Sequence, residues 1–137
     1  MAAFVKFNSF VEALAEKVHN LGADQLKIAL TNTDPTAAAT NYASLTSPLP
    51  TTNLSGATPF NVTTSSSSQT SGTYSLVCAD LTLTATGSVG PFRYVVLYND
   101  TATSDELIGY WDYGSSITLA SAETFLIDFG ATVLTLA

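Results

Sequence analysis

Apolar and polar residues alternate with a period of two along several stretches of the chain. The clearest examples are residues 26–30, 74–78 and 92–98. Such alternation indicates β-strands, because successive side chains of a strand point to opposite faces of the sheet. Residues 92–98 are apolar on both faces, and this pattern predicts a strand at the centre of a sheet.

Turn residues divide much of the remaining chain into further short strands. Residues 81–85 continue the alternation of residues 74–78 on the opposite parity, which predicts a bulge at Ala79 and Asp80. The polar run at residues 65–72 is expected to be a mobile loop tip. The other strands are predicted at residues 59–64, 107–112, 116–119, 123–129 and 132–136. About eight strands separated by such turns predict a mainly β fold, an antiparallel β-sandwich that is jelly-roll-like.

One segment near the N-terminus has the helical period instead. Its apolar residues recur at every fourth position, at Phe10, Leu14 and Val18. Ser9 followed by Glu12 has the form of a capping box, in which the hydroxyl and the carboxylate satisfy backbone N–H groups of the first turn. Gly22 is a natural C-terminal stop. The sequence therefore predicts one N-terminal α-helix over about residues 9–20.

Residues 34–57 have neither period and predict a long irregular excursion. The segment is rich in Ala, Thr, Asn and Pro, and its larger apolar residues are scattered anchors: Tyr42, Leu45, Leu49 and Leu54. Loops of this length inside a compact domain are usually functional or disordered. Spaced apolar anchors favour docking against a surface, so we regard the excursion as a candidate interaction arm.

The chain is the size of one domain and carries few charges. No linker divides its 137 residues, so we expect a single domain over residues 1–137. Charged residues make up only 11% of the chain, against an average of about 25%. Ser and Thr supply most of the polarity, and we expect much of the surface to be contact surface.

The sign of the charge argues against two classes of partner. Four basic and eleven acidic residues give a net charge of −7, which repels phosphate backbones, so nucleic acid is not expected as a partner. Anionic membrane surfaces are disfavoured for the same reason, and no run of about 20 apolar residues could span a bilayer. The first residues lack a basic region followed by a long apolar stretch, so synthesis in a cytoplasm is the expectation.

The sequence offers little for catalysis. His19 is the only histidine and is expected near the C-terminal end of the helix, where a cation suits the helix dipole. Cys78 is the only cysteine, and its place in a strand pattern suits a buried apolar residue better than a nucleophile paired with His19. The chain contains no Walker loop, dinucleotide fingerprint, nucleophile elbow or His-Glu-x-x-His motif. We therefore expect no enzymatic activity and no cofactor.

Two clusters leave other interpretations open. The carboxylates of the loop at residues 99–106 could collect a Ca²⁺ ion or serve a metal-dependent hydrolase if they converged, although a solvated acidic loop is the simpler interpretation. Tyr110, Trp111 and Tyr113 form an aromatic cluster. Exposed, these rings could stack on sugars or anchor a protein interface; buried, they would pack in the core at a strand end.

Two stretches of the sequence resemble a known class of protein. The first comprises residues 7–22 (FNSFVEALAEKVHNLG) and 27–33 (KIALTNT), and the second runs from residues 90–94 (GPFRY) through residues 111–114 (WDYG). With their flanks, the likeness covers residues 4–33 and 70–137. These stretches resemble small virion structural proteins of tailed bacteriophages, of the capsid cement or decoration type.

The resemblance implies a virion structural protein that lies on the capsid surface, where it binds and stabilises the major-capsid shell. It also implies synthesis in the cytoplasm of a bacterial host. Proteins of this type are often β-sandwiches, and they commonly sit as homotrimers where capsomers meet. The expected partners are therefore the major capsid protein and further copies of the chain. No catalytic residues come with this family. The alternative is a tail, baseplate or adaptor component that contacts a receptor or a glycan.

The predicted contact residues are apolar and aromatic, as expected for a protein that stays attached through many weak contacts. They belong to the N-terminal segment, the irregular excursion and the aromatic cluster: Phe4, Phe7, Phe10, Tyr42, Leu45, Leu49, Leu54, Tyr110, Trp111 and Tyr113.

Overall fold

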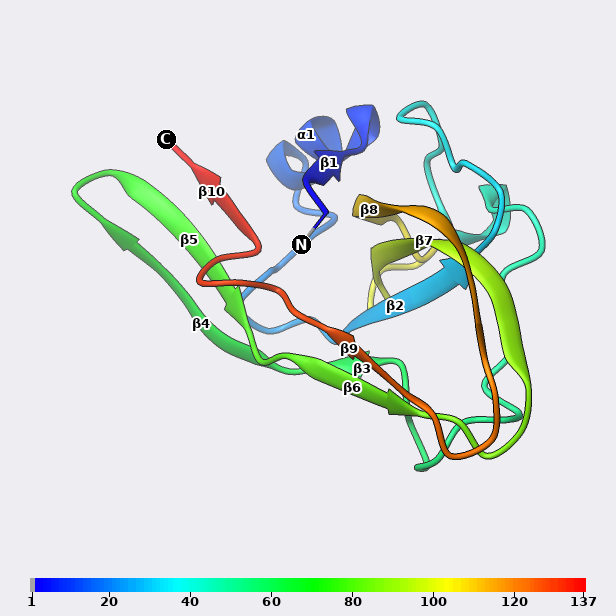
Figure 1. The fold of residues 1–137 in the computed structure, drawn as a ribbon. Coiled ribbons are helices and arrows are strands. Elements are labelled where there is room, and N and C mark those ends of the chain that lie inside the picture. Colours follow the sequence, from blue (N-terminus) through cyan, green and yellow to red (C-terminus); the bar gives the residue numbers. More distant parts are fainter. Residues whose placement is uncertain (1) are drawn as a thin grey trace.

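The alternating stretches of the sequence form strands, and every strand pairing is antiparallel (Figure 1). The computed structural model describes residues 2–137 and contains ten strands, one α-helix and one short 3-10 helix within them. In chain order these are β1 (Phe4–Lys6), α1 (Asn8–Ala15), β2 (Leu26–Thr31), the 3-10 helix (Tyr42–Ser44), β3 (Asn61–Val62), β4 (Thr64–Thr70), β5 (Thr73–Cys78), β6 (Leu81–Thr84), β7 (Val89–Asn99), β8 (Leu107–Leu119), β9 (Thr124–Ile127) and β10 (Leu134–Leu136).

The first layer is a five-stranded sheet with the order β1-β8-β7-β2-β3. β7 lies in its middle and pairs with β8 on one side and with β2 on the other. The prediction that residues 92–98 form a central strand is therefore confirmed. Both faces of β7 are buried, since Val95 and Leu97 pack in one hydrophobic cluster and Val96 and Tyr98 pack in another.

The second layer consists of two small sheets, β10-β5-β4 and β6-β9. β5 and β6 follow each other along the chain with only Ala79 and Asp80 between them, and β9 and β10 run back beside them. The predicted bulge at Ala79 and Asp80 is therefore a break at which the chain passes from one sheet to the other. A register shift is found instead between Thr64 and Ser66 in β4.

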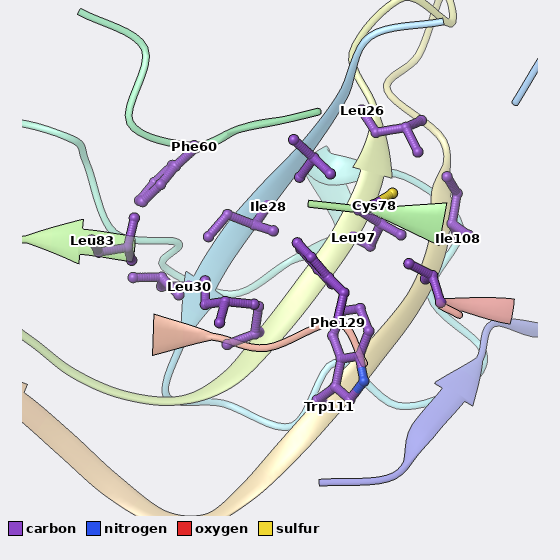
Figure 2. Close-up of a cluster of buried hydrophobic side chains, with 14 of the residues drawn as sticks. Leu26, Ile28, Leu30, Phe60, Cys78, Leu83, Leu97, Ile108, Trp111 and Phe129 are labelled. Atoms are coloured by element: carbon purple, nitrogen blue, oxygen red, sulfur yellow. The ribbon is translucent and has the colours of Figure 1, made fainter. Parts of the chain in front are cut away.

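The larger hydrophobic core lies between these layers. In Figure 2, side chains of β2, β7 and β8 such as Ile28, Leu97 and Trp111 lie close to Cys78 and Leu83 from the second layer and to Phe129. The Trp111 and Phe129 rings have their centroids 5.6 Å apart, and each residue is only 2% exposed. The packing of the layers is sandwich-like.

The predicted helix exists and begins within one residue of its predicted start, but its predicted cap residue and C-terminal end are wrong. It begins at Asn8, and its N-cap is Phe7, which makes no side-chain capping bond, so Ser9 lies inside the helix rather than at its cap. It ends at Ala15, because Lys17 has a φ of 68° and takes the left-handed conformation. The Val18 N–H then donates to Ala13 at 2.9 Å, as in a Schellman motif. A sequence pattern misses this stop because glycine usually occupies that position.

The serine-rich run is a strand rather than a mobile loop tip. Residues 64–70 form β4, which pairs with β5 through a two-residue turn at Ser71 and Gly72. These two residues have φ values of 50° and 84°. The tight two-residue turn of a β-hairpin requires positive φ at both of its central residues, so the observed values fit such a turn.

The predicted strands at residues 107–112 and 116–119 are not separated by a turn, because residues 107–119 form the single long strand β8. The Asp112 side chain accepts a hydrogen bond from the Gly114 N–H at 2.8 Å, and Gly114 has a φ of 86°, so this irregularity bends the strand without ending it.

The fold is mainly β, with antiparallel sheets and one N-terminal helix, as the sequence predicts. Two pairings, β4 with β5 and β7 with β8, are hairpins, whereas β1–β8, β2–β7, β5–β10 and β6–β9 join strands that are not consecutive in the chain. The observed strand order does not establish a jelly roll. Among residues 2–137, no helix is long and apolar enough to cross a membrane.

Phe129 joins the two layers although it lies outside any strand, so its truncation tests the core. We expect Phe129→Ala to lower the free energy of unfolding by about 3–5 kcal/mol, because it removes a buried ring and leaves a cavity. The control is Leu126→Ala on β9, whose side chain is 54% exposed and should change stability by no more than about 0.5 kcal/mol. Urea denaturation of both variants measures the difference. Equal losses would mean that Phe129 does not hold the layers together.

Candidate functional site

Residues 34–57 lie against the five-stranded sheet, and we call them the covering segment. Ala39, Tyr42 and Leu45 pack on the outer face of the sheet, whereas Leu49 and Leu54 pack with the larger core. The Leu49 N–H donates to Leu30 O at 2.8 Å, and the Thr31 hydroxyl donates to Thr46 O at 2.7 Å. Beneath the segment lies the smaller hydrophobic cluster, which contains Phe7, Ala29, Leu45, Tyr94, Val96, Tyr98, Leu107 and Tyr110. The excursion predicted as an arm is therefore docked on the chain's own sheet.

The structure places the predicted contact residues mainly inside the molecule. Six of them are buried: Phe7, Phe10, Leu45, Leu54, Tyr110 and Trp111. The other four are half-buried: Phe4, Tyr42, Leu49 and Tyr113. The side chains of these six residues hold the fold together and offer little surface to a partner in this conformation.

The aromatic cluster does not form a platform. Tyr110 and Trp111 point to opposite faces of the sheet because they are neighbours on one strand. Tyr110 packs against Phe7 with ring centroids 5.1 Å apart, and Trp111 packs against Phe4 at 5.3 Å. The arrangement is that of core packing and provides no stacking surface for a sugar ring.

The exposed part of the molecule that stands out is a continuous stretch of chain without charge. Residues 35–79 contain no Asp, Glu, Lys, Arg or His, so all fifteen charged residues lie elsewhere in the sequence. This stretch includes most of the covering segment and the β4–β5 hairpin. Its many exposed residues are mostly Thr, Ser and Ala, and we call them the uncharged surface.

The β4–β5 hairpin makes this surface prominent. Figure 1 shows the hairpin extending away from the rest of the molecule, with its turn at the far end. All of β4 except Thr64 is exposed, whereas β5 packs Leu76 and Cys78 into the core. The hairpin is thus anchored through β5 and presents β4 to solvent. The sequence pattern does not predict β4, because serine and glutamine do not favour strands. The one local signal is the Ser71-Gly72 pair, which is typical of a turn and directly precedes the alternating residues of β5.

The acidic loop at residues 99–106 is stabilised by hydrogen bonds from its backbone N–H groups to the Asn99 side chain. The buried Asn99 side-chain oxygen accepts from the Thr101 N–H at 3.0 Å and from the Ala102 N–H at 3.1 Å. The Asp100 carboxylate is 3.1 Å from the Lys27 ammonium. Within residues 2–137, no three His, Cys, Asp or Glu side chains are grouped so that they could hold a metal ion. The carboxylates that a metal-dependent hydrolase would need do not converge.

His19 lies past the end of α1 rather than at its C-terminal turn, and it is buried, with 5% of its surface exposed. Its Nδ1 is 3.0 Å from the side-chain nitrogen of Asn99, which also donates to Asp24 at 2.7 Å. This contact suits a neutral ring that accepts at Nδ1. Burial lowers the pKa of His19 below its ordinary value of 6.5, against the opposing effect of the Glu106 and Asp24 carboxylates.

Cys78 is buried, as the sequence predicts. Burial raises the pKa of its thiol, although a hydrogen bond with Thr64 acts in the opposite direction. A thiol with a raised pKa holds less of the reactive thiolate, so its environment suits a core residue.

A scan against protein-family models, a search of curated proteins and a search of solved structures each found no match.

The buried histidine predicts a loss of stability in mild acid. Because the folded pKa lies below the unfolded value of 6.5, the unfolded chain takes up a proton first. The stabilisation is present above pH 6.5 and is lost as the pH falls through the folded pKa. We expect the free energy of unfolding to drop between about pH 7.5 and about pH 5, before most carboxylates titrate. Urea denaturation at a series of pH values measures it.

His19→Gln is the control, because glutamine cannot titrate in this range. Its stability should change less with pH than that of the unaltered chain over the same interval. Parallel profiles for the two proteins would mean that another group causes the loss.

Proposed function

We propose that this chain is a non-enzymatic structural protein of a tailed-bacteriophage virion, a cement or decoration protein that binds and stabilises the major-capsid shell. The observation that carries the proposal is the uncharged surface of residues 35–79, held in place by an ordered β framework. In such a role the partners are the major capsid protein and neighbouring copies of the chain, and the protein resides on the capsid surface.

The composition of this surface suits permanent attachment. Burying a charge in a dry contact is costly unless it is paired, and residues 35–79 have no charge to bury. Ser, Thr and Ala also lose little side-chain entropy on contact, compared with the long side chains of Lys and Glu. Each contact would be weak, and their repetition over a symmetric shell would supply the strength.

The covering segment supports the same role because it is already ordered. It is joined to the rest of the fold by isolated β-bridges between Asn41 and Glu106 and between Leu54 and Ala85. A surface that is fixed before binding does not have to be ordered by the partner, so less of the interaction energy is lost on association.

The resemblance of residues 4–33 and 70–137 to cement proteins supports the shell as the partner. The charge argues in the same direction, since a net charge of −7 opposes contact with the packaged nucleic acid. The buried state of His19 and Cys78, together with the dispersed carboxylates, favours a structural role over a catalytic one.

Reconstitution on shells tests the proposal. We expect the purified chain to bind expanded capsids that lack it, in a fixed ratio to the capsid subunits, and to raise the temperature at which those shells disrupt. Cryo-electron microscopy of the product should show density at the symmetry axes between capsomers. Capsids that neither bind the chain nor gain heat resistance would refute the capsid role.

A pair of charge variants tests which surface makes the contact. Thr46→Glu with Thr52→Glu adds two charges to the uncharged surface at exposed positions. We expect shell affinity to fall about tenfold or more, because the added carboxylates would be desolvated without partners.

The matched control adds the same charge outside residues 35–79, through Ala23→Glu with Thr103→Glu, which are also exposed. Its affinity should stay close to that of the unaltered chain. Equal weakening of both variants would indicate general repulsion, and would remove the uncharged surface as the site of contact.

A further inference from the structure

β4 is an edge strand whose outer side has no partner. The sheet order is β10-β5-β4, and β4 pairs with β5 from Ser66 opposite Val77 to Thr70 opposite Thr73. In the described part of the chain, no backbone group of residues 66–70 is bonded to a segment other than β5. Half of the backbone groups of β4 therefore face solvent.

The turn geometry identifies the outward-facing groups. In a hairpin with a two-residue turn, the closing pair exchanges backbone hydrogen bonds, and hydrogen-bonded pairs then alternate along the ladder. The closing pair here is Thr70 with Thr73. Thr70, Ser68 and Ser66 consequently bond to β5, whereas the N–H and C=O groups of Ser67 and Gln69 point outward.

This edge lacks the usual protection against pairing. Natural edge strands are commonly short or carry a charged residue or proline. Every other strand at a sheet edge has four residues or fewer, and β1 also carries an exposed Lys6. β4 has seven residues, none of them charged and none of them proline. Its one irregularity is the register shift between Thr64 and Ser66, at the end farthest from the turn.

We propose that β4 pairs with β4 of a second copy of this chain, antiparallel about a two-fold axis, so that their three-stranded sheets become one continuous sheet. This pairing rests on the proposed function, because it assigns a second copy of the chain as one partner of the uncharged surface. On a shell that carries trimers, such a contact would join neighbouring trimers.

Charge and shape favour a second copy as the occupant. Two copies with a net charge of −7 repel each other at most surfaces, but residues 35–79 bring no charge into this contact. An antiparallel two-fold arrangement is self-complementary, because the same outward N–H and C=O groups meet on both strands. Serine side chains are small: Ser66 and Ser68 share one face with their hydroxyls 3.3 Å apart, and Ser67 on the other face bonds to Tyr74 at 2.8 Å.

The test measures self-association of the full chain in the absence of capsids. Sedimentation equilibrium at rising protein concentration should reveal a dimer. Over the same range, the backbone amide resonances of Ser67 and Gln69 should shift more than those of Ser66 and Ser68, which already bond to β5. A chain that stays monomeric up to its solubility limit, with unmoved Ser67 and Gln69 amides, would overturn the proposal.

Charge variants then locate the contact. Ser66→Lys with Ser68→Lys places like charges opposite each other across the two-fold axis, and we expect the dimer dissociation constant to rise tenfold or more. The control, Thr82→Lys with Thr124→Lys, adds the same charge at exposed positions of the β6–β9 sheet and should leave the dimer in place. A dimer that resists the β4 substitutions would place the contact elsewhere and overturn the proposal.

A mixture provides the positive control for folding and pairing. Ser66→Glu with Ser68→Glu should also fail to dimerise alone, but it should form a mixed dimer with the lysine variant, and circular dichroism should show both variants folded. Failure of the mixture to associate would argue against β4 pairing. Because no capsid is present, loss of this dimer and loss of shell binding are separate results, so the two proposals can fail independently.

Discussion

The structure depends on the central strand β7, because both of its faces must be buried. β7 is apolar on both faces, and Val95, Val96 and Leu97 in its middle are all 0% exposed. Fully burying an aliphatic side chain is worth roughly 1.5–3 kcal/mol, so uncovering either face would remove a large part of the stability of a small domain. One layer of strands can cover only one face. The other face therefore has to be covered by something that is not part of the sandwich.

The covering segment meets this requirement, and that explains its composition. Two of its large apolar residues lie at the cluster on the outer face, with Leu45 buried and Tyr42 packed against Tyr98 at a centroid distance of 5.0 Å. The other two, Leu49 and Leu54, pack with the larger core and fix the far end of the segment. Between these anchors the chain needs only small residues that allow irregular turns, such as Thr36 and Ser47, which both have positive φ. The segment is thus a structural cover on its inner side and an uncharged surface on its outer side. The two roles do not compete, because different residues serve them.

The sequence predicts the class of the fold because that class is set by local periodicity. Alternation predicts β2, β5 and the central position of β7 correctly, and the period of four predicts a helix that contains the buried Phe10. The incorrect strand predictions concern segments whose secondary structure depends on pairing with a strand elsewhere in the sequence. A serine-rich run is a strand here because β5 pairs with it, and residues 107–119 remain one strand because β7 pairs with them on both sides of the irregularity at Gly114. The helix ends early because Lys17 adopts a conformation that its side chain does not favour.

The candidate site was harder to predict than the fold, for a related reason. Scattered apolar residues such as Leu45 and Leu54 suggest contacts, but a sequence does not show whether the contact is with the same chain or with another one. The uncharged surface is recognised by the absence of charged residues over residues 35–79. The sequence shows this absence, but only the structure shows which of these residues are exposed.

The free edge of β4 is compatible with a stable monomer and is useful only at high local concentration. Its outward groups are solvated, so they cost the isolated chain little. Antiparallel pairing of two such edges would form about four backbone hydrogen bonds, each worth roughly 0.5–1.5 kcal/mol. That sum, about 2–6 kcal/mol, exceeds the cost of bringing two molecules together, estimated at about 4 kcal/mol or more, by a small margin at best. The pairing of free molecules is therefore weak and requires a high protein concentration. It becomes more effective when a shell already holds neighbouring copies at the right distance, because their effective concentration then compensates for the low affinity.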